Sequence, residues 1–190
     1  MDKLRFGYAL TGSFCTFAES FVQMENLVNS GADVYPIMSF NASTTDTRFG
    51  KAEDFIKRAK ELTGHDIIKT LTDAEPVGPM KMFDLLIVSP CTGNTVSKLV
   101  YGIYDTPVTL AVKSHLRNQR PVLIGVSTND ALSASGKNIG TLLNYRNYYF
   151  IPIKQDNPEK KPFSMVCNFE KTYEAALLAL SGKQVQPIIQ

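Results

Sequence analysis

The chain has 190 residues, of which 44% are hydrophobic, and this size and composition predict one domain, residues 1–190, with a sizeable core. Its 20 lysines and arginines nearly balance 18 aspartates and glutamates, and no long run of one sign indicates a nucleic-acid or membrane surface. No apolar stretch approaches the roughly 18 to 20 residues of a membrane span, and the apolar start breaks at Thr11 without a cleavage site. We therefore expect a cytoplasmic protein.

Apolar runs of strand length alternate with amphipathic stretches in the first half of the chain, which is typical of βα units around a parallel sheet. The predicted elements are, in order, a strand at 4–10, a helix at 14–30, a strand at 33–40, a polar loop at 41–49, a helix at 51–62 and short pieces over 67–82. Ser13 is expected to cap the first helix and Gly31 to end it.

The second half continues the alternation. Residues 83–89 are nearly all apolar, which predicts a central strand buried on both faces. The elements that follow are a turn at 90–94, helices at 95–102 and 106–118, a strand at 121–127, a helix at 137–147, a strand at 148–153, a charged loop at 154–163, a helix at 169–180 and a loosely held tail at 184–190. The pattern predicts an α/β fold, a Rossmann-like (flavodoxin-like) three-layer sandwich with a mainly parallel sheet.

Small hydroxyl and amide residues follow several of the predicted strands, and ligands of open parallel sheets bind outside the carboxyl ends of the strands. These residues are Thr11–Ser13, Ser39, Pro90–Thr95 and Ser127–Asn129. They allow backbone N–H groups to approach a phosphate while a helix adds its positive end. One such turn alone is commonly only a helix cap, but three at three strand ends favour a site. Without a Walker motif or a GxGxxG fingerprint, a mononucleotide is the favoured ligand.

Three segments resemble the signature regions of the flavin-dependent cysteine decarboxylase (HFCD) flavoprotein family, whose relatives include prenyl-FMN synthases. They are Leu10–Ser13, SPCTGNTVSKLVYGIYDT at 89–106 and GVSTNDAL at 125–132. The family pattern P-x-[ST]-x-N-T-x-x-K, followed by G-x-x-D, is matched by Pro90, Thr92, Asn94, Thr95, Lys98, Gly102 and Asp105. The resemblance extends from residue 4 to about residue 180 and implies a bound FMN.

The resemblance also assigns roles by position. It implies that Gly12, Ser13 and Ser39 meet the FMN phosphate. Thr92, Gly93, Asn94 and Thr95 would line the phosphate and ribityl side. Ser127, Thr128 and Asn129 would face the isoalloxazine edge or the substrate. The amides of Asn94 and Asn129 are the candidate catalytic side chains, because they can orient a carboxylate although they cannot act as bases.

The chain departs from the decarboxylases where they place a catalytic histidine, because residues 39–45 contain none. The loop LTGSFC, the middle variant with Cys91 and Gly93, and residues 150–164 resemble one branch of the family more closely. That branch comprises flavoprotein subunits that act with an NADP-binding partner to oxidise a dihydro-dicarboxylate. Its relatives assemble as trimers and dodecamers. A decarboxylase of a cysteinyl substrate and a non-catalytic flavin scaffold stay open as alternatives.

Several side chains have both a structural and a functional interpretation. Lys154, Lys160 and Lys161 form either a solvated loop or a site for a dicarboxylate. His65 and His115 follow no strand end, so solvated structural roles are expected. Core packing is the favoured role of the aromatic side chains at 145 and 148–150. Cys15, Cys91 and Cys167 lack metal-ligand spacing and are expected to be small, partly buried apolar residues, without a disulfide or a metal.

Overall fold

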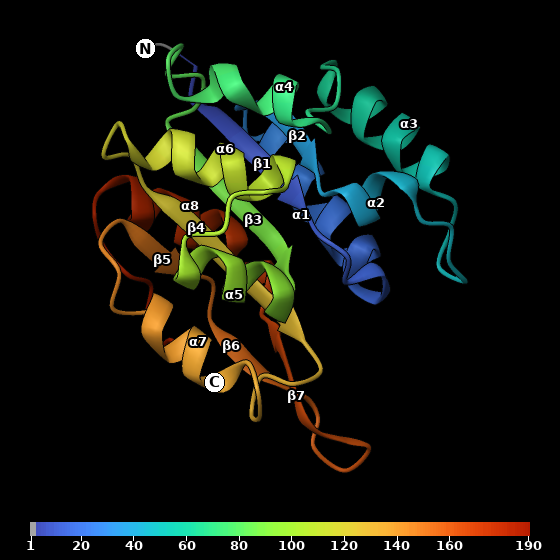
Figure 1. Ribbon diagram of the computed structural model, residues 1–190, viewed down its shortest axis with the longest axis vertical. Coiled ribbons are helices and arrows are strands. Elements are labelled where there is room, and N and C mark those ends of the chain that lie inside the picture. The colour runs from blue at the N-terminus through green and yellow to red at the C-terminus, as the bar shows by residue number, and fades with distance from the viewer. Residues whose placement is uncertain (1–2) are drawn as a thin grey trace.

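The computed structural model describes residues 3–190, and its sheet has the parallel strand order β2-β1-β3-β4-β5 (Figure 1). The strands are β1 (Arg5–Leu10), β2 (Asp33–Met38), β3 (Leu85–Cys91), β4 (Val122–Thr128), β5 (Tyr148–Phe150), β6 (Ile153–Asn157) and β7 (Lys161–Cys167). β3 is buried along its whole length, as its apolar sequence predicts. The order reverses between β1 and β3, which is where ligands of this architecture bind.

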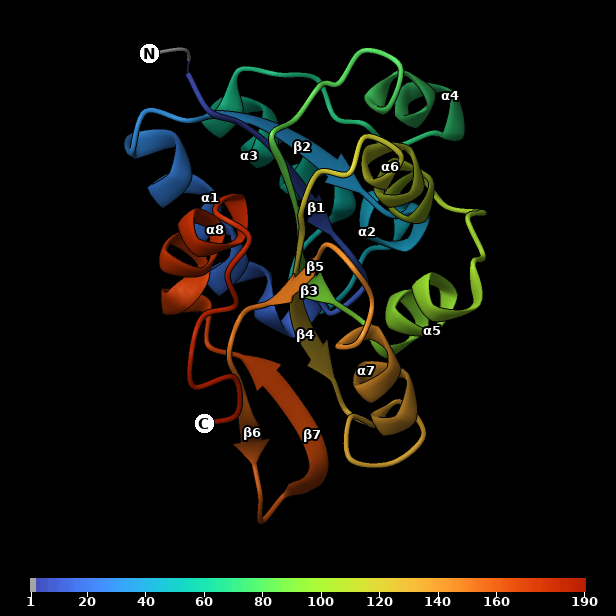
Figure 2. The ribbon, with the colours of Figure 1, turned by 90° about the vertical axis from the view of Figure 1, so that its left-hand side faces the viewer.

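Helices cover both faces of the sheet (Figure 2). They are α1 (Phe17–Asn29), α2 (Phe40–Thr44), α3 (Ala52–Thr63), α4 (Leu71–Ala74), α5 (Gly93–Tyr101), α6 (Pro107–Leu116), α7 (Gly136–Leu142) and α8 (Thr172–Leu180). Side chains of α1, α3 and α8 pack into one apolar core, and those of α5, α6 and α7 pack into a second core on the opposite face. The expected three-layer α/β sandwich is thereby confirmed.

The predicted charged loop at 154–163 is wrong, because these residues belong to an antiparallel hairpin of β6 and β7. The last residues of β4 pair with β7, so the hairpin extends the sheet beyond the parallel strands (Figure 2). Most side chains near the tip, including Lys160 and Phe163, are exposed. Only the base of each strand is buried, so the hairpin lacks the regular alternation of apolar and polar residues by which strands are predicted.

The tail is held in place, and the prediction that it is loose is wrong. The side-chain amide of Gln184 donates to the carbonyl of Phe150 at 2.7 Å and accepts from its N–H at 2.8 Å. Val185 is buried, and Ile189 bridges Ile153 in parallel. These partners lie far away in the sequence, so local patterns could not reveal them.

Three boundaries near the strand ends also differ from the expectation. Pro90 and Cys91 continue β3, and the polar segment after β2 begins as the short helix α2. The chain enters α1 through a 3-10 turn (Phe14–Thr16), and Ser13 makes no side-chain capping bond. The Ser13 hydroxyl serves instead in a contact across the sheet edge.

Candidate functional site

The ends of β1 and β3 are joined at the point where the strand order reverses. The Thr11 hydroxyl donates to the carbonyl of Pro90 at 2.8 Å and accepts from the N–H of Thr92 at 3.0 Å. Thr11 is buried, so both of these bonds are shielded from water. This connection fixes the spacing between the turn after β1 and the start of α5.

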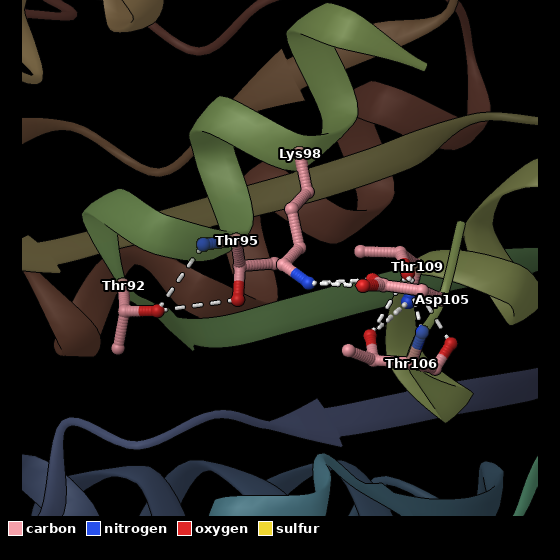
Figure 3. Close-up of polar contacts among 6 residues, drawn as sticks. All are labelled: Thr92, Thr95, Lys98, Asp105, Thr106 and Thr109. Carbon is pink, nitrogen blue, oxygen red and sulfur yellow. Dashed lines mark hydrogen bonds and ion pairs between the residues drawn. The ribbon is translucent and has the colours of Figure 1, made fainter. Parts of the chain in front are cut away.

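Helix α5 begins at this crevice with Thr92 as its N-cap. The Thr92 hydroxyl accepts from the N–H of Thr95 at 3.3 Å and lies 3.2 Å from the Thr95 hydroxyl (Figure 3). The first N–H groups of a helix have no partner within it, and here they belong to Gly93 and Asn94. The Asn94 side chain is exposed and makes no hydrogen bond within residues 3–190. Donors are therefore free at the positive end of the helix dipole.

Gly93 occupies a crowded position. A Cβ atom there would lie 2.3 Å from the Ser135 hydroxyl oxygen and 2.9 Å from both Asp130 Oδ1 and Thr128 Oγ1. Asp130 in turn accepts from Thr128 Oγ1 at 2.6 Å and from Ser135 Oγ at 2.9 Å. The glycine thus lets α5 approach the hydroxyl-rich turn after β4.

The remainder of the motif at 89–106 is held in place by polar contacts of its own. Lys98 Nζ donates to the two carboxylate oxygens of Asp105 at 2.5 and 2.7 Å (Figure 3). This hydrogen bond lowers the pKa of Asp105 below its ordinary value. Thr106 and Thr109 form a capping box at the start of α6. The motif therefore fixes the geometry of α5 and the connection that follows it.

Hydroxyl groups from the other strand ends complete the crevice. Ser13 Oγ lies 2.8 Å from Ser127 Oγ, which connects the turn after β1 to the end of β4. Ser39 caps α2 by accepting from the N–H of Ala42 at 3.2 Å, and its hydroxyl hydrogen has no acceptor among residues 3–190. Asn129 is exposed, and its side-chain oxygen accepts from the Ser164 hydroxyl of β7 at 3.4 Å.

Two cavities adjoin at this edge of the sheet, with Gly12 and Thr92 lining both. The first, called here the hairpin cavity, measures about 380 Å³ and is lined by Gly12, Ser13, Phe14, Cys15, Thr16, Arg48, Phe49, Thr92, Ser127, Thr128, Asn129, Asp156, Lys161, Ser164, Met165 and Val166. The second, called the crevice cavity, measures about 480 Å³ and is lined by Thr11, Gly12, Ser39, Phe40, Asn41, Thr92, Asn94, Thr95, Lys98, Asp105 and Thr106. Volumes of this size are typical of cofactor sites.

A family model described as Flavoprotein matches residues 1–176. The chain belongs to the flavoprotein family. The B subunit of dipicolinate synthase from Bacillus subtilis (strain 168) is 44% identical over 185 residues, which cover 97% of this chain and 92% of the relative. The expected family membership and the expected branch are confirmed.

Solved structures agree with this membership. The B subunit of dipicolinate synthase from Bacillus halodurans C has a TM-score of 0.90 at 42% identity, with 100% of this chain and 98% of that chain covered. Burkholderia xenovorans DmrB in complex with FMN has a TM-score of 0.65 at 19% identity, with 78% and 87% covered. The similarity to DmrB shows that the two proteins share a fold.

The predicted site residues of the flavoprotein gather around the two cavities with three exceptions, Gly93, Lys154 and Lys160. Gly93 is buried and packs closely against the turn after β4. Lys160 is exposed and lines neither cavity, and its N–H bonds to Asn157. Lys154 lines a neighbouring hollow of about 350 Å³ together with Lys161. Lys161 also reaches the hairpin cavity.

Sequence reasoning missed Arg48, Phe49 and Met165 as lining residues. Arg48 and Phe49 belong to the predicted polar loop, and Met165 lies on β7, which was not predicted as a strand. An arginine next to an aromatic residue in a polar loop was the available signal, but it does not reveal which cavity the loop borders.

Neither histidine lines the hairpin cavity or the crevice cavity. The prediction that His115 is solvated is wrong, because the side chain is buried. Its ring nitrogen Nε2 lies 2.9 Å from the carbonyl oxygen of Pro121, and burial lowers the pKa of His115 to about 4. His65 stacks on Tyr35 and its Nε2 lies 2.8 Å from Asp33 Oδ1. Both histidines have structural contacts away from the cavities.

The cysteines fall into two groups. Cys91 and Cys167 are buried, and burial raises the pKa of both thiols, to about 12 for Cys167. Cys15 is exposed beside the hairpin cavity, contrary to the expectation for all three, because the 3-10 turn carries it to the surface.

Within residues 3–190 no helix is long and apolar enough to cross a membrane.

Proposed function

We propose that the chain is the FMN-binding subunit of a dipicolinate synthase, which takes part in the NADP-linked oxidation of dihydrodipicolinate to dipicolinate. The observation that carries the proposal is the set of free donors at the β1–β3 crevice, in a chain similar over nearly its whole length to such a component. The nicotinamide site is assigned to the partner, the A subunit of dipicolinate synthase, because this chain lacks a dinucleotide fingerprint.

The donor set fits a phosphorylated flavin. The crevice cavity is lined by Ser39, with its free hydroxyl hydrogen, and by Asn94, which supplies a side-chain amide and an N–H at the start of α5; such donors are suited to a phosphate. A Cβ atom on Gly12 would clash with no neighbouring atom, so the space beside this residue is open. Because glycine has no side chain, its backbone is accessible from both cavities. The hairpin cavity adds apolar walls from Phe14, Met165 and other residues, which suit an aromatic ring.

The residues of the chain bind and orient in this proposal. The bound flavin supplies the capacity to accept a hydride. Ser127 and Thr128 hold the edge of the ring, and Asn129 orients the substrate from the end of β4. Ser13, which the resemblance assigns to the phosphate, lines only the hairpin cavity of the two and is therefore assigned to the ring edge as well. Its Ser164 contact fixes the amide group, since the serine hydroxyl donates to its oxygen. Lys161 pairs with a carboxylate of the substrate.

The assembly is part of the proposal. We infer a homo-oligomer, a trimer or a dodecamer, that associates with the NADP-binding partner in the mother cell of a sporulating bacterium. The name of the relatives implies a second kind of polypeptide, and the DmrB structure is described as a cubic protein cage. Sedimentation of the chain alone and with its partner measures both associations.

Reconstitution with the NADP-binding partner, NADP and the precursor tests the function. We expect dipicolinate to form with FMN-loaded chain, and activity to fall when the flavin is stripped and return when FMN is restored. Equal activity without flavin would contradict catalysis and support the scaffold alternative. Release of carbon dioxide from a cysteinyl peptide would support the decarboxylase alternative, for which neither cavity supplies a histidine.

A further inference from the structure

Two cations from separate segments reach the wall of the hairpin cavity. Arg48 lies in the connection between α2 and α3, and Lys161 begins β7. Both line the cavity that Ser127 and Asn129 also line. More than 100 residues separate them in the sequence, so only the fold brings them to one site.

The Arg48 guanidinium is uncommitted. It is exposed, and within residues 3–190 it makes neither a hydrogen bond nor an ion pair with a carboxylate. Its Cζ lies 4.9 Å from the centre of the Phe49 ring, a contact that orients the group without using its N–H donors. All five donors therefore stay available to a ligand.

Lys161 is already paired. Its Nζ donates to Asp156 Oδ2 at 2.6 Å, and this bond raises the pKa of Lys161 while the charge of Arg48 opposes the rise. Both cations line the same cavity, so their charges act on the same bound ligand. Because two positive groups face one carboxylate here, the wall retains a positive charge. A bound anion would share Lys161 with Asp156 but would have Arg48 to itself.

We propose that Arg48 determines specificity for a dicarboxylate, by binding one carboxylate through its planar fork at a subsite that Lys161 completes. The inference rests on the proposed function and deepens it. A guanidinium matches a carboxylate with two parallel N–H donors, which an ammonium group cannot do. Phe49 and Met165 add apolar surface to the same cavity, where the ring that carries the carboxylates is accommodated.

The same fork also matches a phosphate, so the test separates the two anions. The FMN-loaded chain is titrated with dipicolinate and with picolinate, which has the same ring and one carboxylate fewer, and binding is followed by calorimetry. The wild-type chain is expected to bind dipicolinate about tenfold more tightly than picolinate. Arg48→Gln should lose about tenfold for dipicolinate and little for picolinate, while its affinity for FMN stays within about twofold.

Arg58→Gln is the matched control, because Arg58 also lies over a ring, that of Phe21 at 4.7 Å, and lines neither cavity. It should bind both ligands like the wild type. Arg48→Lys, which keeps the charge without the fork, should recover only part of the preference.

Three results would overturn the inference. The wild type could bind the two ligands equally, Arg48→Gln could keep the full preference for dipicolinate, or Arg48→Gln could weaken FMN instead, which would place the guanidinium at the phosphate. If the wild type fails to bind FMN, the proposed function itself is contradicted, and this is recognised before dipicolinate or picolinate is added. Circular dichroism of Arg48→Gln verifies that the variant is folded.

Discussion

Two regions of the site use their polar residues differently. The rim is the set of residues at the carboxyl ends of β1, β3 and β4 and the start of α5, and the mouth is the entrance to the hairpin cavity, which Arg48 and the hairpin lysine Lys161 border. At the rim, Thr11, Thr92 and Lys98 are committed to hydrogen bonds within the chain, at 2.5 to 3.3 Å. At the mouth, Arg48 is exposed and its charged group makes no ion pair within residues 3–190, while Lys161 is paired with the single carboxylate of Asp156. The comparison indicates that the rim holds a fixed shape for a cofactor, whereas the mouth provides charges for a changing ligand.

The largest effect on the rim is expected from Gly93→Ala. Its Cβ would collide with the hydroxyl cluster around Asp130, so we expect a loss of about 2 to 3 kcal/mol in the free energy of unfolding. Urea denaturation measures this loss. Gly140→Ala is the control, because a Cβ there meets no atom within 4 Å and α7 should keep or gain stability. Equal stability of the two variants would contradict a rigid rim.

Asn94→Ala tests the role of a rim donor that has no hydrogen-bond partner within residues 3–190, in contrast to donors already bonded within the chain. The Asn94 side chain is exposed and unbonded within residues 3–190, so its removal should leave the free energy of unfolding unchanged. FMN binding should weaken by about 1 to 2 kcal/mol, measured by quenching of flavin fluorescence. Asn144→Ala, remote from both cavities, is the control. An unchanged FMN affinity would remove Asn94 from the site.

The adjacent lysines of the hairpin test the mouth. Lys161→Met should weaken dipicolinate binding to the FMN-loaded chain by about 1 kcal/mol, because Lys161 lines the hairpin cavity, whereas Lys160→Met should leave it unchanged. Both variants should unfold within about 0.5 kcal/mol of the wild type. Equal losses of affinity would indicate a diffuse field of charge in place of a defined subsite.

The smallest effect is expected from acid at the Lys98–Asp105 pair. Lys98 lowers the pKa of Asp105, so the pair stabilises the fold above the ordinary aspartate pKa of about 3.9 and loses this effect as the pH falls through the lower folded value. The stability difference between the wild type and Lys98→Met should therefore be constant from about pH 5 to 8 and should narrow below about pH 4. A difference that does not depend on pH would indicate packing by the lysine stem.

The same contrast explains what the sequence predicts and what it does not. Apolar runs place β1, β3 and β4 within two residues of their observed bounds, and small polar residues after them mark the rim. The hairpin is not predicted because its strands are exposed toward the tip and buried only at the base, so no regular alternation of apolar and polar residues runs along them. Arg48 is not predicted as a site residue, because its place at the cavity depends on the path of an exposed loop, and no local sequence pattern encodes this path.

A comparison of FMN with riboflavin tests the central claim most directly, because the two ligands share the ring and the ribityl chain and differ in the phosphate. If the free donors at the β1–β3 crevice bind that phosphate, two or more charge-assisted hydrogen bonds should make FMN bind about a hundredfold more tightly than riboflavin. Equal dissociation constants for the two flavins would contradict the account.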